Sequence, residues 1–330
     1  MAALDGCWDW QPATPSVIQR PAALLRLQGA DALRFLHGQS SQAIEAAAAG
    51  DCRPTCLIGP TARMRALAQV LVDGDGAWLL IEAGDAEAVR SALDRVLFPA
   101  DRVELGTLRS VQLLTPVARG EPLALPELGP PCPDGRWQAL PGHSDIWQLG
   151  ADLVLGNGQA PAALGALPLL DGALQERWRI QRGWPTSSGE CNDATNPFEL
   201  GLANRVSLQK GCYVGQETLA KLATYDGVKQ QLRRWCWSQP ADQAAGPPPE
   251  QALRSGQTLH GPDAERAGVI TTALSLEQAD GSTLWLGLAL VRRSALAQPS
   301  LRAGDSDAGP WLALSKPTDF VDPPVGSGQR

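Results

Sequence analysis

The chain has 330 residues, of which 44% are hydrophobic and 19% are charged, which is enough for two or three packed units with buried cores. Its 28 basic and 35 acidic residues leave a net charge of −7, which argues against broad binding to nucleic-acid backbones. No apolar run is long enough to cross a bilayer and no charged-then-apolar leader opens the sequence, so we expect a soluble, cytoplasmic protein without a membrane partner.

Seven cysteines, an odd number, are scattered along the chain without a CxxC pair, and only three histidines accompany them. Disulfide frameworks and metal sites need recurring short spacings, so we expect free thiols in a reducing compartment and no resident metal site. Cys52 and Cys56 form one close pair. Because Pro54 between them disfavours a shared helix face, we interpret them as two small, half-buried residues.

The first half of the chain is predicted to place helices on a largely antiparallel sheet. Residues 24–27 form a short apolar strand, and apolar residues at helical spacing predict a helix from Asp31 to Gly50. The runs LAQVLV and AWLLIE, separated by DGDG, predict a hairpin, and a helix over 85–98 follows. Strands are predicted near VELG and RSVQLL, and the Pro- and Gly-rich residues 116–137 are predicted to be a loop.

The chain after about residue 138 is predicted to contain two further parts. A further α/β stretch from about 138 to 225 contains the helix ALQERWRIQRG, which ends at Gly183. From about 230, the strands QLRRWCW, AGVITTAL and TLWLGLALV predict a small β-barrel or sandwich. The predicted division is therefore 1–225, with subdomains of about 1–115 and 138–225, followed by a barrel with a Pro/Gly-rich tail over 226–330.

The most informative stretch is KGCYVGQE, residues 210–217. Gly211 and Gly215 flank a thiol and an aromatic ring, so the backbone can turn tightly and approach a ligand closely. Cys212 stands just before the helix QETLAKLA, where the helix dipole and the Lys210 ammonium favour a thiolate. An activated, partly exposed Cys212 is one interpretation, and an inert buried cysteine in an ordinary turn is the other. Glu217, an acid in the first helical turn, equally fits simple helix stabilisation.

Tryptophan is abundant, with eleven residues against two tyrosines and four phenylalanines. Some of these rings are placed to stack on a flat ligand, although core packing is the more usual role of large aromatic side chains. His37, beside Gly38 at a helix end, is interpreted as a surface or capping residue. The tryptophans that bracket the candidate helix and barrel are Trp8, Trp10, Trp178, Trp184, Trp235 and Trp237.

The octapeptide KGCYVGQE resembles the signature of the YgfZ family, which is related in fold to the T-protein of the glycine cleavage system. The resemblance extends to WRIQRGWP and NPFELGL before the octapeptide, to LQGADALRFLHGQSSQ near the N-terminus, and to ERAGVITTAL and LGLALVRR near the C-terminus. It implies an α+β fold of T-protein-like folate-binding domains around a central hole, with a small C-terminal β-barrel.

The resemblance implies tetrahydrofolate, or another reduced folate, as the cofactor. A flat pterin needs a shaped pocket, and its glutamate tail needs cationic neighbours. Arg179 matches the family's arginine in the helix before the octapeptide and is expected to bind a folate carboxylate or the pterin, although it equally fits a side chain that covers an apolar surface. The resemblance assigns further cofactor-binding positions to Tyr213, Gln216, Glu217 and Glu199, and catalytic positions to Cys212 and Lys210.

Two departures from the family pattern argue against aminomethyl transfer. In the T-protein an acidic residue after the first hairpin region assists attack by a folate nitrogen, whereas GPTARMRALAQVLV has no acid between Gly59 and Asp73. The stretch HGQSSQAI also lacks the Asp that is usual after GQ-x-T.

Three functions remain open. The favoured one is a tetrahydrofolate-binding accessory protein that assembles or repairs the iron–sulfur clusters of specific enzymes, with an indirect effect on tRNA modification and with Cys212 as its thiol. Its partners would be folate and iron–sulfur enzymes or cluster-assembly proteins. The second is a folate-dependent one-carbon transferase, an aminomethyltransferase or demethylase. The third is a binding protein that links folate status to tRNA modification through partner contacts alone.

Overall fold

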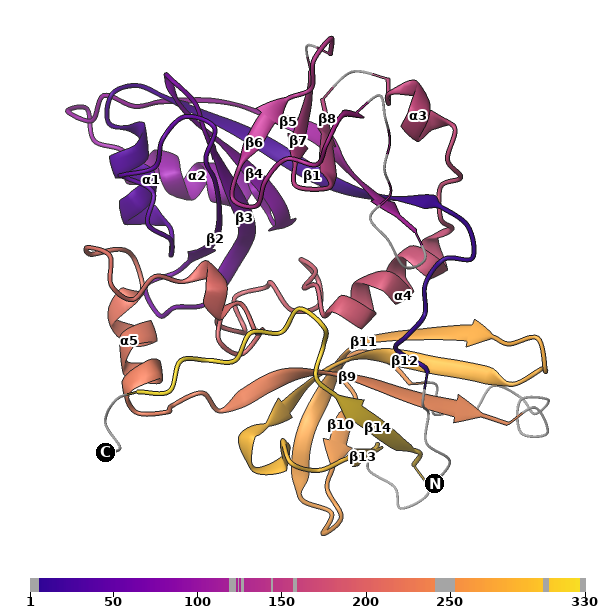
Figure 1. Cartoon of the computed structure of the whole chain (residues 1–330). Helices are drawn as coiled ribbons and strands as arrows, with labels where there is room; N and C mark the ends of the chain where they lie inside the picture. Colours follow the sequence, from indigo (N-terminus) through magenta and orange to yellow (C-terminus); the bar gives the residue numbers. More distant parts are fainter. Residues whose placement is uncertain are drawn as a thin grey trace.

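The chain folds into a sheet, a barrel and, between them in the sequence, residues 159–229, which we call the connecting segment. These three parts are arranged in a ring around a central space (Figure 1). The computed structural model describes residues 6–118, 123, 125, 128–143, 145–156, 159–240, 253–304 and 309–326. The predicted α+β fold class with a C-terminal barrel is confirmed. The loop predicted over 116–137 and the predicted tail lie partly outside the described residues.

The sheet has eight strands in the order β2-β3-β4-β1-β5-β8-β7-β6, and every neighbouring pair is antiparallel. The two strands predicted near VELG and RSVQLL are one long strand, and the last three strands, which come from the stretch after residue 136, extend the same sheet. The strands are β1 (Ser16–Gln28), β2 (Cys52–Ile58), β3 (Met64–Val72), β4 (Gly76–Gly84), β5 (Glu104–Val117), β6 (Trp137–Ala139), β7 (Ile146–Leu149) and β8 (Asp152–Leu155).

Local sequence signals explain the predictions that the structure confirms. The DGDG turn joins β3 to β4 in a hairpin that pairs Val72 with Ala77. Helix α2 (Ala86–Arg95) begins after Asp85, whose carboxylate accepts a hydrogen bond from the Ala88 amide at 3.0 Å. Helix α4 (Gly172–Arg182) begins in the same way after Asp171 and ends at Gly183, in the left-handed conformation that glycine favours. Short helices α3 (Ala162–Gly165), η2 (Ala203–Arg205) and η3 (Arg293–Ala295) complete the connections with α5 (Gln216–Thr224).

The helix predicted from Asp31 to Gly50 is wrong in its length, because α1 covers only Ala32–Gln39. Two serines end it by bonding to backbone groups. Ser40 donates to the Leu36 carbonyl at 2.8 Å, and Ser41 donates to the Arg205 carbonyl at 2.6 Å while it accepts from the Cys56 amide at 2.9 Å. Serine hydroxyls compete with helical hydrogen bonds in this way, and the Ser41 partners are remote in sequence.

The barrel resolves the choice between barrel and sandwich, because its six strands close in the order β10-β11-β12-β9-β14-β13. Its chain then returns across the connecting segment towards α5 (Figure 1), where the Val321 amide donates to the Gly201 carbonyl at 2.8 Å. The strands are β9 (Gln230–Gln239), β10 (Thr258–His260), β11 (Arg266–Glu277), β12 (Thr283–Arg292), β13 (Ser300–Ala303) and β14 (Trp311–Ser315).

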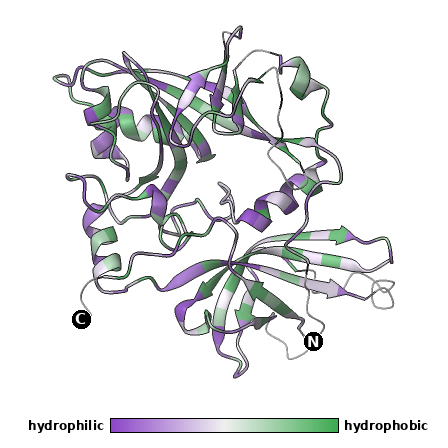
Figure 2. Cartoon of the chain, viewed as in Figure 1, coloured by the Kyte–Doolittle hydropathy of each residue, from purple (hydrophilic) through white to green (hydrophobic). Residues whose placement is uncertain are grey.

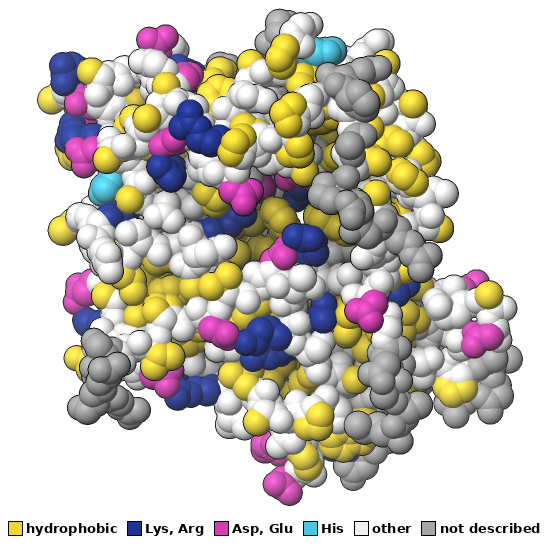
Figure 3. Space-filling model, viewed as in Figure 1, with side chains coloured by type: hydrophobic (Ala, Val, Ile, Leu, Met, Phe, Trp, Pro, Cys, Tyr) yellow, Lys and Arg dark blue, Asp and Glu magenta, His cyan; other side chains and the backbone are white. Residues whose placement is uncertain are grey.

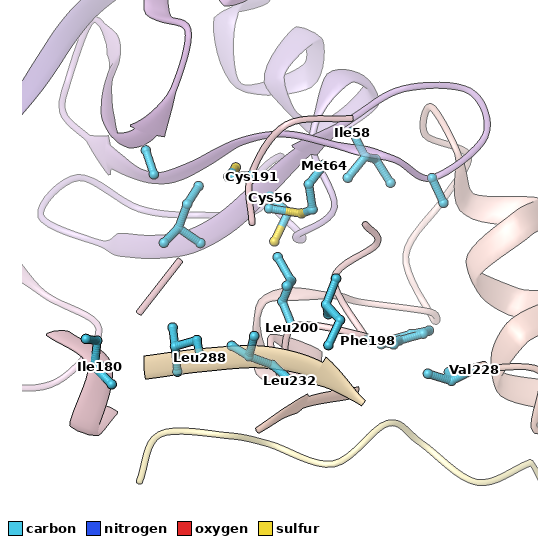
Figure 4. Close-up of a cluster of buried hydrophobic side chains, with 14 of the residues drawn as sticks. Cys56, Ile58, Met64, Ile180, Cys191, Phe198, Leu200, Val228, Leu232 and Leu288 are labelled. Carbon is cyan, nitrogen blue, oxygen red and sulfur yellow. The ribbon is translucent and has the colours of Figure 1, made fainter. Parts of the chain in front are cut away.

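One hydrophobic cluster joins the three regions (Figure 4). It combines Met64 of the sheet, Ile180 of α4, Phe198 of the connecting segment and Leu288 of the barrel, all buried. Figure 2 shows apolar residues concentrated in the sheet and barrel strands, whereas α4 is largely polar. Burial of this shared cluster fixes the barrel against the sheet, so the residues around the central space hold defined positions.

Two further observations concern the described residues only. None of their helices combines the length and the apolar composition that a bilayer-spanning helix needs. Their His, Cys, Asp and Glu side chains form no group of three or more that is placed to hold a metal ion. Cys52 and Cys56, interpreted as half-buried, are both fully buried in β2.

Candidate functional site

The octapeptide, residues 210–217, forms a turn against the end of α1 and the loop between β2 and β3. The Val214 amide donates to the Gly38 carbonyl at 3.1 Å. Gly215 has a φ of 81°, and a Cβ there would lie 2.7 Å from the carbonyl oxygen of Gly59. At Gly211 a Cβ would meet only the His37 ring, at 3.8 Å. The turn therefore requires glycine at 215 but leaves room for a side chain at 211.

The octapeptide presents a thiol to solvent. Cys212 is exposed, whereas the other six cysteines are buried. Burial raises the pKa of Cys52, Cys56 and Cys191 to about 12, which makes these thiols poor nucleophiles. Cys212 is thus the cysteine that a surface partner can reach.

Lys210 holds the turn to the end of α1. Its ammonium donates to the carbonyls of His37, Ser40 (2.7 Å) and Gln42 (2.9 Å), so its three N–H groups are all used. The same nitrogen lies 4.4 Å from the centre of the Tyr213 ring. Burial lowers the pKa of Lys210 to about 7. The lysine predicted to stabilise a Cys212 thiolate therefore has its donors committed to backbone carbonyls.

Tyr213, Gln216 and Glu217 of the octapeptide have different surroundings. Tyr213 is buried, burial raises its pKa to about 12, and its hydroxyl has no hydrogen-bond partner within the described part of the chain. Gln216 donates to the Lys210 carbonyl at 3.1 Å, and the exposed Glu217 pairs with Lys221 at 2.7 Å. The Glu217–Lys221 pair matches the interpretation of Glu217 as a helix-stabilising acid.

Three cavities share Trp184 as a lining residue. The space-filling view is hollowed near its centre and shows hydrophobic side chains inside the hollow (Figure 3). The β3 cavity, of about 380 Å³, is lined by Leu67, Leu200, Leu202, Arg205, Asp319 and Phe320 among others. The β4 cavity, of about 390 Å³, is lined by Arg20, Ile81, Glu82, Arg179, Thr186 and Ser187 among others. The Trp10 cavity, of about 420 Å³, is lined by Trp10, Asp152, Trp178, Gln181 and Arg182 among others.

Arginines dominate the electrostatics of these cavities, because each lining carboxylate faces one. The Arg20 guanidinium also lies over the Trp184 ring, 4.5 Å from its centre. Burial raises the pKa of Asp152 even though Arg20 and Thr115 favour its charged form. The three ion pairs are Glu82 with Arg205 at 3.2 Å, Arg20 with Asp152 at 3.5 Å, and Arg182 with Asp319 at 2.7 Å.

Arg179, predicted to bind folate, reaches the β4 cavity. Both arms of its guanidinium donate to the Glu176 carboxylate at 2.8 Å, and it donates further to Thr272 at 3.0 Å and to the Trp184 carbonyl. The Arg179 guanidinium, which was predicted to bind a folate carboxylate, therefore already has hydrogen-bond partners within the protein.

Glu199, also predicted to bind folate, is buried and accepts a hydrogen bond from the Asn196 amide at 3.0 Å. Burial raises its pKa. Its neighbour Leu200 lines the β3 cavity, whereas neither Glu199 nor any octapeptide residue is among the residues lining the three central cavities. The structure thus separates the predicted set into a surface turn and a cavity region.

Sequence reasoning missed Glu82, the carboxylate of the β4 cavity. The comparison with the T-protein pattern covered only the range between Gly59 and Asp73, which contains β3. Glu82 lies on the adjacent strand β4. A single charged residue at the end of the apolar run AWLLIE was the available signal, because a buried carboxylate needs a partner. That partner, Arg205, lies 123 positions away in the sequence.

Comparisons with known proteins define the fold. The crystal structure of glycine cleavage system aminomethyltransferase T from Bartonella henselae superposes with a TM-score of 0.71 over 97% of this chain and 90% of that chain, at 17% sequence identity. The chain therefore has the fold of the aminomethyltransferase T-proteins.

Sequence comparison gives a more limited result. A chloroplastic protein of Arabidopsis thaliana, described as a "putative transferase", is 29% identical over 63% of this chain. The match covers 52% of the relative, so this chain spans about half its length. No protein-family model matches the sequence.

Proposed function

We propose that this chain is a YgfZ-type protein of the cytoplasm that binds tetrahydrofolate in its central cavities and takes part in the assembly or repair of iron–sulfur clusters. The observation that carries the proposal is the combination, on one T-protein-like fold, of connected central cavities with a single exposed thiol in the octapeptide turn.

The cavity region has the chemistry that a reduced folate needs. Its cavities, of about 380 to 420 Å³, lie in the size range of small-molecule sites. Trp184 and leucines supply flat and apolar walls for a pterin, Glu82 supplies an acceptor, and Arg182 supplies positive charge for a glutamate tail. A bound reduced folate carries one-carbon units on its ring nitrogens; the protein residues bind it, orient it and shield it from water.

The thiol of Cys212 is directed at a protein partner in this proposal. Because Cys212 is exposed and does not line the central cavities, it faces the surface rather than the folate. Its thiolate can attack a disulfide of an iron–sulfur enzyme or cluster-assembly protein, forming one mixed disulfide and releasing one thiolate. The Gly215 turn and the Lys210 bonds hold the sulfur in a fixed position for that encounter.

A genetic experiment tests the cluster part of the proposal. A strain that lacks this protein should lose activity in a radical-type tRNA thiolation enzyme, and the wild-type chain should restore it. Cys212→Ser should fail to restore it, whereas Gly211→Ala, a change with room in the same turn, should succeed. Full activity in the deletion strain contradicts the role in clusters. Rescue by Cys212→Ser instead favours action through partner contacts alone.

A one-carbon transferase is the second candidate function. It is favoured by the relative described as a "putative transferase" and by the presence of a carboxylate, Glu82, in the β4 cavity. Against it, Glu82 is held by Arg205 and Gln69, which suits a fixed charge better than a general base. Incubating the protein with tetrahydrofolate and amine donors, and finding no methylenetetrahydrofolate, would remove this candidate.

A further inference from the structure

We infer that Glu82 and Arg20 recognise the 2-amino-4-oxopyrimidine edge of a ring bound in the β4 cavity. This inference rests on the proposed folate function and deepens it by naming the residues that select the ring. It also extends to any ring with the same edge, since pterins and guanine share it.

The unused hydrogen-bonding capacity of Glu82 is the first observation. The Glu82 side chain is 1% exposed and lines the β4 cavity. It accepts from Gln69 at 3.0 Å through one oxygen and from Arg205 at 3.2 Å through the other. A carboxylate offers about four lone-pair sites, so about half of its accepting capacity is left within the described part of the chain.

The second observation is an unpaired donor in the same cavity. Arg20 lines the β4 cavity, and its Nε atom is buried without a hydrogen-bond partner among the described residues. The other end of the guanidinium donates to Thr115 at 3.1 Å and pairs with Asp152. A buried N–H without a partner is unfavourable, and a bound acceptor would satisfy it.

These two groups match one chemical pattern. The 2-amino group and the ring N–H of a 2-amino-4-oxopyrimidine are two adjacent donors, and the 4-oxo oxygen beside them is an acceptor. The Glu82 carboxylate accepts from both donors, and Arg20 Nε donates to the oxygen. Trp184 forms a wall of the same cavity, where a flat ring packs favourably. A purely structural role, in which the Glu82–Arg205 ion pair links β4 to η2, would explain that pair. It would not explain the unpaired Nε donor of Arg20.

The test is calorimetric titration with three ligands: tetrahydrofolate, an analogue that lacks the 2-amino group, and guanosine. The wild type should bind the analogue about 10- to 100-fold more weakly than tetrahydrofolate. Glu82→Gln should weaken tetrahydrofolate binding by a similar factor and lose most of the discrimination between the two. Asp51→Asn, which removes another arginine-paired carboxylate outside the cavity linings, should change neither value.

The outcomes separate the inference from the proposed function. Tetrahydrofolate binding with no discrimination against the analogue overturns the inference alone, and this comparison needs no variant if Glu82→Gln fails to fold. Binding of guanosine but not tetrahydrofolate, weakened by Glu82→Gln, supports edge recognition and overturns the folate function. Binding of none of the three ligands overturns both.

Discussion

The octapeptide turn and the central cavities differ in how their residues come together. The turn is one continuous segment, and its glycines, lysine and thiol can be read in order from the sequence. The cavities collect residues from β1, β3, β4, α4, η2 and the segment after the barrel. A continuous motif therefore shows the part of this protein that exposes a thiol, whereas only the fold shows the cavities.

The two regions also differ in electrostatics. In the turn, the buried Lys210 is committed to backbone carbonyls, and the one ion pair, Glu217 with Lys221, is exposed. In the cavity region, each of the three lining carboxylates pairs with an arginine. The turn thus holds its thiol in a fixed position, whereas the cavity region holds paired charges in fixed positions.

The first prediction separates the two glycines of the turn. Gly215→Ala should lower the free energy of unfolding by about 2–4 kcal/mol, because a left-handed non-glycine residue is strained and the new Cβ would lie 2.7 Å from the Gly59 oxygen. Gly211→Ala, with no atom nearer than 3.8 Å, should change it by less than about 0.5 kcal/mol. Urea denaturation of both variants measures the difference, and equal losses would show that the turn differs from the structure.

The second prediction concerns the tie between the turn and α1. Lys210→Met removes the donor to three carbonyls and should cost about 2 kcal/mol of unfolding free energy. Burial lowers the Lys210 pKa from 10.5 to about 7, so the unfolded chain holds this proton more tightly between those pH values. The stability of the wild type relative to Lys210→Met should therefore rise from pH 7 towards pH 10.5. A difference that stays flat over this range contradicts the lowered pKa of Lys210.

The third and smallest effect on stability is expected at the thiol itself. Cys212→Ala should change the unfolding free energy by less than about 0.5 kcal/mol, because the side chain is exposed. It should nevertheless abolish the fast reaction of the native protein with a thiol reagent, in which the wild type reacts at one of its seven cysteines. Fast labelling of a second cysteine would show that the buried thiols are accessible.

The sequence predicted the elements whose signals are local. The β3–β4 hairpin, α2, the end of α4 at Gly183 and the barrel strands all follow from turn residues, caps and periodicity. Local sequence signals were not sufficient where contacts between residues distant in the sequence determine the structure. Helix α1 ends early because Ser41 bonds to Arg205, and the carbonyl partners of Lys210, which lie about 170 positions earlier in the chain, could not be inferred from the octapeptide alone. The pairing of Glu82 with Arg205 needed the fold for the same reason.

The central claim is that the cavities around Trp184 hold a reduced folate, and calorimetric titration of tetrahydrofolate tests it most directly. We expect saturable binding to the wild type and binding at least about tenfold weaker to Trp184→Ala, which opens the shared wall of all three cavities. Trp311→Ala, which removes an exposed tryptophan of the barrel, should bind like the wild type. No binding by the wild type, or equal binding by Trp184→Ala, would contradict the account.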